Sequence, residues 1–261
     1  EIAELIKEGL PEVEEAVRLF RFGAGNIELN EERFTGESVV WADAGFFHVF
    51  SFPLISGDKN RVLTEPYSVV LSESLARKLF AGLDVIGRVL EIDGSDYQVT
   101  GIMKDMPVNS HFRHDALASF STLLRIQPRL IENNGISFPT YVLMRQDANP
   151  DGFRSKVLAM ADKIAKERFG PMGIALRYDL QPLTRIYLHT NLNLDSGNYG
   201  DIRNVYIFSF LAFFILLIAV FNYVNLITAQ SEKRSREIGL RKVAGASRSD
   251  LIRQFIFESL I

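Results

Sequence analysis

An uncharged, strongly apolar run near the C-terminus constrains this chain more than any other feature. No charged residue occurs from Asn204 to Ser231, a run of 28 residues in which Phe, Leu, Ile and Val dominate. At about 1.5 Å per residue, a helix of this length covers the roughly 30 Å hydrocarbon core of a bilayer. A buried helix of a soluble protein seldom continues so far without a charged face. The run therefore predicts a transmembrane helix over residues 204–230.

Positive charge is distributed unequally on the two sides of this span. Residues 232–253 contain seven Lys and Arg residues and three acidic residues. In residues 185–204, the only Lys or Arg residues are Arg185 and Arg203. Lys and Arg beside a membrane span stay on the cytoplasmic side. The bias predicts that residues 1 to about 200 lie outside the cytoplasm and that the C-terminal tail lies inside it.

The composition excludes several classes of function. The chain has 261 residues, a net charge of −3 and no cysteine. Without cysteine there is no disulfide framework, no thiolate metal site and no thiol nucleophile. Basic residues form no stripe apart from the cluster after the span, so no nucleic-acid partner is expected. About 200 residues outside the membrane suffice for one good core or two small ones.

The two ends of the sequence indicate a larger protein. The chain begins at Glu1 without a signal sequence, although an exported domain of this size needs a signal or an earlier span. Its last residues, 251–261, are again apolar. We therefore expect an internal piece of a longer, multi-pass membrane protein.

The clearest folded unit of the outer part lies between residues 67 and 102. A buried strand over residues 67–71 leads into an amphipathic helix that Ser72 caps and Gly82 ends. Two further strands follow, joined at the hairpin dipeptide Asp93–Gly94. The pattern predicts a strand, a helix and a hairpin in one compact arrangement.

Other segments extend the mixture of helices and strands. Residues 11–15 read as a short helical turn, and residues 137–144 as a strand. A helix begins at Asn149 and closes at Gly170, and residues 176–180 alternate as a half-buried strand. This mixed order, without an internal repeat, predicts an α+β fold.

One glycine pair has the spacing of a phosphate loop. Gly82 and Gly87 are separated by four residues, but Arg88 and Val89 stand where Lys and Ser or Thr are required. Without that Lys and the hydroxyl that binds Mg²⁺, the loop cannot hold a nucleotide. We expect a helix end and a turn, and no ATP hydrolysis by this chain itself.

Two histidines close in sequence invite a metal or acid–base interpretation. His111, His114 and Asp115 supply too few ligands for a metal site, and no nucleophile can be singled out beside them. We therefore interpret them as residues of a surface loop. No catalytic, cofactor-binding or metal-binding residue is predicted, and the chain is not expected to be an enzyme.

Two amides lie inside the apolar span. Asn222 and Asn225 are three residues apart and therefore share one helix face. Amides in lipid need partners, so this face is predicted to contact another helix. A pore-lining role is the alternative.

The basic tail after the span has more structure than a simple stop-transfer signal. In residues 234–247, apolar Ile238, Leu240 and Val243 are interleaved with charges, and two glycines are predicted to interrupt the helix. Ser247 followed by Asp250 is the pattern of a capping box that starts a second helix. We predict a docking elbow, with a lipid-binding stop-transfer cluster as the alternative.

The tail and the span together resemble a known family. The segments similar to FtsX/MacB-type ABC transporter permeases are Asn222–Ala229, Arg236–Ser247 and Leu251–Ser259. They correspond to the end of that family's second membrane helix, its cytoplasmic elbow and the start of its third helix.

The outer part agrees with this resemblance. Leu75–Phe80, Ile86–Gly87 and the strands that end at Ile102 are similar to the family's periplasmic core domain. Ser110–Phe112 and Gln181–Leu188 resemble the long permeases common in Bacteroidetes-type bacteria.

The resemblance implies a periplasmic domain of two lobes, one inserted into the other. Residues 1–35 and 112–190 would form the split first lobe, and residues 36–111 the inserted second lobe. Residues 191–203 would be a linker, and residues 231–261 the elbow and the start of the next membrane helix.

The family also implies a function and partners. Its members sit in the bacterial inner membrane and span it several times, and a separate cytoplasmic ABC ATPase drives them. They serve export or efflux, lipoprotein release or envelope regulation, as dimers or pseudo-dimers that can recruit a periplasmic partner protein. The residues that would couple this chain to the ATPase are Arg236, Glu237, Ile238, Gly239, Leu240, Arg241, Lys242 and Gly245.

Two other classes of protein remain as alternatives. An extracytoplasmic sensor would have one span and a signalling helix of uninterrupted heptads, which Gly239 and Gly245 are expected to break. A membrane-anchored hydrolase would need His111, His114 and Asp115 to act without a credible nucleophile.

Overall fold

The computed structural model describes most of the chain, which forms two compact units. Unit 1 comprises residues 1–200 and unit 2 residues 201–261. The backbone is described everywhere except at residues 1, 22–23, 129–137, 174, 176–177, 190–199, 246, 248, 250–251, 254–255 and 258–261.

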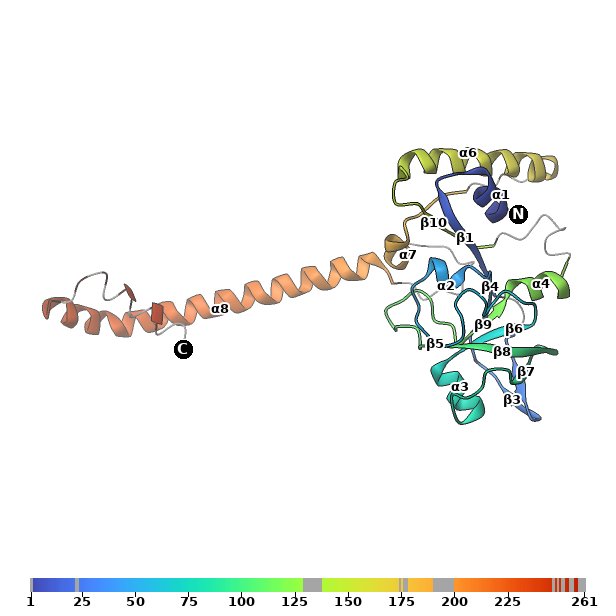
Figure 1. The fold of residues 1–261 in the computed structure, drawn as a ribbon. Coiled ribbons are helices and arrows are strands. Elements are labelled where there is room, and N and C mark those ends of the chain that lie inside the picture. The colour runs from blue at the N-terminus through green and yellow to red at the C-terminus, as the bar shows by residue number, and fades with distance from the viewer. Residues whose placement is uncertain are drawn as a thin grey trace. The chain divides into compact units, whose positions relative to one another are not determined.

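Unit 1 mixes helices and strands along its whole length, as an α+β fold does (Figure 1). Its strands are β1 (Val13–Phe20), β2 (Ile27–Leu29), β3 (Glu32–Phe34), β4 (Val39–Ala42), β5 (Leu54–Ser56), β6 (Ser68–Ser72), β7 (Val89–Ile92), β8 (Ser95–Met103), β9 (Ala116–Ser119) and β10 (Thr140–Met144). Its helices are α1 (Ile2–Gly9), α2 (Phe46–Val49), α3 (Glu73–Phe80), α4 (Phe120–Ile126), α6 (Pro150–Phe169), the 3₁₀ turn η1 (Gly170–Met172) and α7 (Leu183–His189). Unit 2 contains α8 (Ile202–Val243).

The strands of unit 1 form one mixed sheet. Its order is β10-β1-β4-β9-β6-β8-β7-β2-β3, and β5 pairs with β8 beside this path. The pairs β4–β9 and β6–β8 are parallel, and the other pairs are antiparallel. The α+β prediction is confirmed.

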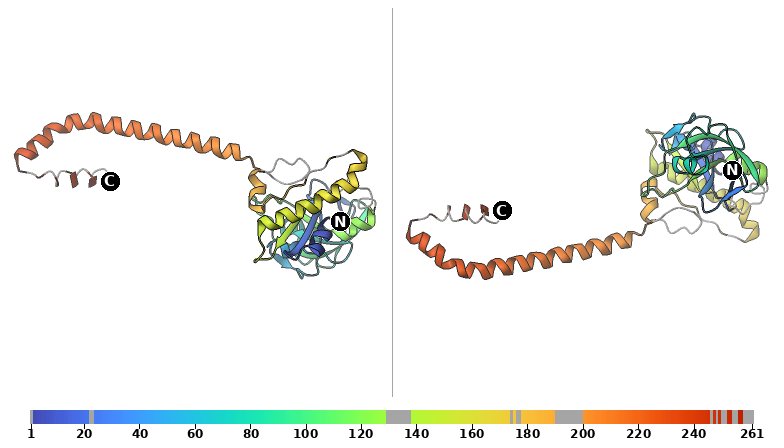
Figure 2. Two further views of the ribbon diagram at one scale, coloured as in Figure 1. Left: turned by 90° about the horizontal axis from the view of Figure 1, so that it is seen from above. Right: turned by 90° about the horizontal axis from the view of Figure 1, so that it is seen from below.

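β1 changes its neighbour along its length. Residues 13–18 pair with β10, whereas Leu19 and Phe20 pair with β4. Ala16 packs into a cluster with α1 and α6 and Val17 into a cluster with α2, because neighbouring residues of a strand face opposite sides of the sheet. In Figures 1 and 2, α6 and α1 accompany β1 and β10, and α3 lies with β6, β7 and β8. Tyr141 of β10 contacts Phe50 beside α2, so apolar packing on one face of the sheet continues across the change of partner in β1.

The unit predicted between residues 67 and 102 is confirmed. Ser72 caps α3, with its hydroxyl accepting a hydrogen bond from the Leu75 amide at 3.2 Å. The helix ends at Ala81 in the left-handed conformation, one residue before the expected glycine. Asp93 and Gly94 both have positive φ, at 45° and 86°, which is the geometry of the two-residue turn that matches strand twist.

Two local predictions are wrong. Residues 13–15 belong to β1, although Pro11 suggested a helical turn. The described residues 178–180 form no strand, and Leu180 instead packs against the cluster of α1 and α6. In both places tertiary packing decides the outcome, which a local pattern does not report.

The strand pairings also bear on the predicted lobes. β2 pairs with β7, and β9 pairs with β4 and β6, so segments on both sides of residues 36 and 111 share the sheet. The division into residues 1–35 with 112–190 and residues 36–111 stays a prediction. The change of partner in β1 lies within the predicted first lobe.

Tyr97 is fully buried in the larger core and predicts a response to alkaline pH. Its hydroxyl accepts a hydrogen bond from Trp41 Nε1 at 3.1 Å. Burial raises the pKa of Tyr97 to about 12, although the bond from Trp41 acts in the opposite direction. The native state therefore favours the neutral phenol, and this stabilisation is complete below the unfolded pKa of about 10 and lost as the pH rises through about 12.

We expect Tyr97→Phe to remove part of the alkaline destabilisation of the domain. At neutral pH the variant should be less stable by about 1–3 kcal/mol, because the buried Trp41 N–H loses its acceptor. Between pH 10 and about 12 the difference from the parent should shrink. Thermal unfolding across this range measures both effects, and Tyr67→Phe, at a more exposed phenol, is the control. A constant difference at all pH values would contradict the assignment.

Candidate functional site: the membrane helix and its C-terminal end

α8 contains the transmembrane helix. Residues Ile202–Ala229 have a mean hydropathy of 2.5 over their most apolar window, and none of that window is buried within the structure. Large apolar side chains such as Phe208 and Val220 face outward, with exposed fractions of 69% and 52%. Such a surface is unfavourable in water and favourable in lipid. Among the described residues, this is the single helix long and apolar enough to cross a membrane.

The amides of Asn222 and Asn225 lie on the outside of this helix. Both residues are exposed in unit 2. They are about 60° apart around the axis, since three residues turn an α-helix by about 300°. Helix contact and pore lining both remain open for them, and either role supplies the partner that an amide in lipid needs.

The C-terminal end of α8 differs from the prediction at Gly239. α8 continues without interruption through Gly239 to Val243, so the helix does not break there. A glycine inside a helix costs only about 1 kcal/mol, which good helix formers close by, such as Glu237, Leu240 and Arg241, can offset. The helix ends where the Ala244 amide donates to the Leu240 carbonyl at 3.0 Å and Gly245 adopts a φ of 92°. In the described part of the elbow, α8 therefore breaks at Gly245 and not at Gly239.

The continuous helix also changes which apolar residues can act together. Leu240 and Val243 are 71% and 90% exposed and lie about 60° apart around the axis. Ile238 lies about 160° from Leu240, on the other side. For five neighbouring residues the structure describes the helical backbone but not the side chains: Arg236, Glu237, Ile238, Arg241 and Lys242. The apolar face that the structure describes consists of Leu240 and Val243.

The interpretation of His111 and His114 as surface-loop residues is wrong. Both are buried, with exposed fractions of 8% and 6%. The His111 ring lies 3.9 Å from the Phe112 ring, and His114 Nδ1 lies 3.1 Å from Ser38 Oγ. The neighbouring carboxylate of Asp115 accepts a hydrogen bond from the Ser38 amide at 2.8 Å. These contacts tie distant segments together, which is a structural role.

The glycine pair Gly82 and Gly87 is a connection between α3 and β7. The Gly87 amide donates to the Val99 carbonyl at 2.7 Å, which fixes the turn against β8. No group of three or more His, Cys, Asp or Glu in the described part of the chain is placed to hold a metal ion.

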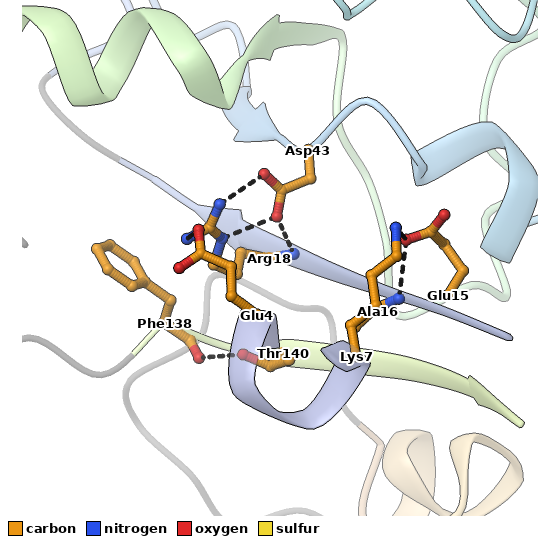
Figure 3. Close-up of polar contacts among 8 residues, drawn as sticks. All are labelled: Glu4, Lys7, Glu15, Ala16, Arg18, Asp43, Phe138 and Thr140. Atoms are coloured by element: carbon orange, nitrogen blue, oxygen red, sulfur yellow. Dashed lines mark hydrogen bonds and ion pairs between the residues drawn. The ribbon is translucent and has the colours of Figure 1, made fainter. Parts of the chain in front are cut away.

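Sequence reasoning missed a buried charge cluster around Arg18 (Figure 3). Arg18 is 7% exposed and is ion-paired with Asp43 at 2.8 Å and with Glu4 at 3.2 Å. Its guanidinium also lies 4.3 Å from the centre of the Phe120 ring. Burial opposes the charge on Arg18, but the hydrogen bonds and charge of Asp43, with Glu4, raise the pKa of Arg18 above its ordinary value. An arginine inside the apolar run of β1 is the one signal that could have found this cluster.

Family comparisons cover most of the chain. Residues 1–160 match the MacB-like periplasmic core domain, and residues 209–261 match the FtsX-like permease C-terminal region. The chain is 25% identical over 231 residues to the macrolide export ATP-binding/permease protein MacB of Agrobacterium fabrum, covering 86% of this chain and 33% of that protein. It is 22% identical over 235 residues to the ABC transporter permease YknZ of Bacillus subtilis, covering 88% of this chain and 54% of that protein. The chain thus spans about a third to about half the length of these relatives.

Solved structures agree with the fold of unit 1. A domain of a permease protein from Porphyromonas gingivalis superposes with a TM-score of 0.56 at 27% identity, covering 69% of this chain and 77% of that one. The periplasmic region of MacB from Actinobacillus actinomycetemcomitans superposes with a TM-score of 0.51 at 16% identity, covering 64% and 74%, which shows the fold alone. The chain belongs to the FtsX/MacB-type ABC transporter permeases, with their MacB-like periplasmic core domain followed by a transmembrane helix.

Proposed function

We propose that this chain is the part of a permease subunit that couples ATP hydrolysis in the cytoplasm to movement of the periplasmic domain. The observation that carries the proposal is the continuity of α8 from Ile202 to Val243, through the apolar span and into the basic tail. A helix held by backbone hydrogen bonds along its length resists compression and bending, so a displacement at one end reaches the other. Loss of ATPase binding on substitution of the exposed face at Leu240 and Val243 tests this coupling.

The elbow would provide the contact with the ATPase. Leu240 and Val243 offer an exposed apolar face, and Glu237, Arg241 and Lys242 add charges of both signs that can fix orientation. Gly245 turns the chain away after the last helical residue. The ATPase itself would be a separate subunit. The name of the relative MacB combines ATP-binding with permease, whereas YknZ is named as a permease.

The proposal includes the surroundings of the chain in the full-length protein. The protein would span the inner membrane several times and work as a dimer or pseudo-dimer, in which the Asn222 face contacts another membrane helix. A periplasmic partner protein would receive the movement, for export, lipoprotein release or envelope regulation. The match to permease families at both ends of the chain favours this function over that of an extracytoplasmic sensor.

The orientation of the chain in the membrane gives a testable prediction. Single cysteines at Asn60 and Ser247, both exposed, should be labelled differently by a membrane-impermeant thiol reagent in cells whose outer membrane alone has been opened. We expect labelling at Asn60 only, because the positive residues after the span hold Ser247 inside. Cells with both membranes opened are the control and should label both positions. Labelling at Ser247 but not at Asn60 in the intact inner membrane would reverse the topology.

A further inference from the structure

The short helix α7 carries apolar side chains that unit 1 does not bury. None of its residues is buried, and Leu183 is 50% exposed. Ile186 and Tyr187 are partly exposed. Because an α-helix turns by about 100° per residue, these three side chains lie within an arc of about 100° on one face. Arg185 lies about 160° from Leu183, so the helix has one apolar face and one polar face.

The end of α7 is tied to the residue that closes unit 1. The Gly200 amide donates to the Tyr187 carbonyl at 2.8 Å. A Cβ atom added at Gly200 would lie 2.9 Å from Tyr187 Cε1 and 3.2 Å from Leu188 Cδ2, so the absence of a side chain permits this close approach. α8 begins two residues later, at Ile202. Two residues of chain reach at most about 7 Å, so the end of α7 stays near the start of α8 at any angle between the two units.

The first turn of α8 lies at the surface of the membrane. Asp201 starts this turn, with Oδ1 accepting a hydrogen bond from the Arg203 amide at 2.8 Å, and both charged side chains belong in water or among headgroups. Apolar residues follow from Val205, and Tyr206, which is 68% exposed, is of a type that is enriched at membrane interfaces. The headgroup layer is about 5–8 Å thick on each side of the hydrocarbon. The length of the chain therefore holds α7 at this layer.

We propose that α7 lies along the periplasmic surface of the inner membrane, with Leu183, Ile186 and Tyr187 inserted among the lipids of the outer leaflet. A helix with one apolar face is stable in this position, because that face leaves water while the polar face stays among the headgroups. Arg185 on the polar face can extend to lipid phosphates, and residues 181–189 contain no acidic residue that would repel them.

The attachment to the span compensates for the small size of this helix. Seven residues bury too little apolar surface for firm membrane binding by themselves. The neighbouring span, however, keeps α7 at the lipid surface, so a weak contact is occupied most of the time. The contact would fix the end of the periplasmic domain at the membrane surface, and it requires neither an ATPase nor a second protein.

The surroundings of single nitroxide labels test this placement. The labels go on Leu183→Cys and Ile186→Cys, as separate variants of the full-length protein in nanodiscs of phosphatidylethanolamine and phosphatidylglycerol. The 261 residues contain no cysteine, and any cysteine elsewhere in the protein is first replaced by serine. Oxygen concentrates in lipid, whereas a neutral nickel chelate stays in water. We expect the ratio of collisions with oxygen to collisions with the chelate to be several-fold higher at both positions than for a label in water.

Two control positions complete the experiment. Arg185→Cys places the label on the opposite face of the same helix and should give a clearly lower ratio, and Asn60→Cys, at an exposed residue, is the reference for water. Equal ratios at positions 183 and 185 would show that α7 lies in water. Few collisions with either reagent at position 183 would show that protein covers this face. Either result would overturn the proposal, and neither depends on whether the elbow binds an ATPase.

Discussion

Replacing Asp43 with alanine should lower the free energy of unfolding of the periplasmic domain by about 3 kcal/mol. Removing one partner of a buried ion pair costs about 3–5 kcal/mol, because the remaining charge is left without compensation. The lower end applies here, since Glu4 stays 3.2 Å from the guanidinium and its own side chain is 58% exposed. Urea unfolding followed by the fluorescence of Trp41, the single Trp of the chain and fully buried, measures the loss.

The matched substitution is Arg18→Met, and the two effects should differ in size. Methionine fills most of the volume of the arginine stem and leaves no buried charge, and Asp43 keeps some contact with water at 22% side-chain exposure. The loss in Arg18→Met should therefore be smaller than in Asp43→Ala. Equal or larger destabilisation by Arg18→Met would show that packing around the stem, and not the orphaned charge, dominates at this site.

The elements predicted correctly are those whose signals are local. The unit of β6, α3, β7 and β8 follows from a capping serine, an apolar helix face and the Asp93–Gly94 turn, all within 36 residues of one another. The transmembrane helix could also be predicted, because its length and lack of charge need no partner elsewhere in the chain.

The residues that sequence reasoning misjudged or missed have partners far away in the sequence. His114 is buried because Ser38, 76 residues earlier, lies beside it, and Arg18 is paired with Asp43, 25 residues later. The residues that surround them in the sequence do not indicate such contacts. The interruption expected at Gly239 failed for a different reason, since a single glycine weakens a helix without ending it when its neighbours favour helix.

The docking role of the tail stays a prediction, and the structure corrects where its helix is interrupted. The interleaved charges and apolar residues after the span indicated a docking segment, and Gly245 ends the helix as the pattern suggested. The continuous helix places Ile238 and Leu240 on different sides, which periodicity assigns only once the helix is known to be unbroken. The exposed pair Leu240 and Val243 is therefore the face to alter.

The double substitution Leu240→Asp with Val243→Asp should abolish binding of the ATPase subunit. Apolar residues exposed to this degree at the end of a helix are suited to fill pockets on a partner, and burying a Leu or Val side chain contributes about 1.5–3 kcal/mol. Two anchors replaced by carboxylates should weaken the contact by about 100-fold or more. Membrane insertion should be unaffected, because the span ends at Ala229 and the basic residues after it are unchanged.

The control adds the same charge without removing the anchors. Ser247 and Ser249 follow the helix end and are exposed, with their hydroxyls 2.8 Å apart. Ser247→Asp with Ser249→Asp introduces two carboxylates close to the elbow but leaves Leu240 and Val243 in place. This variant should retain most of the ATPase binding.

Retention of the ATPase subunit by the full-length protein, purified from membranes in mild detergent, tests the proposed coupling most directly. The unaltered protein and the variant with aspartates at positions 247 and 249 should carry the ATPase through purification and hydrolyse ATP. The variant with aspartates at positions 240 and 243 should be inserted in the membrane in equal amount but arrive without the ATPase. Full retention of the ATPase by that variant, with undiminished ATP hydrolysis, would contradict the account and leave the tail as a basic stop-transfer signal.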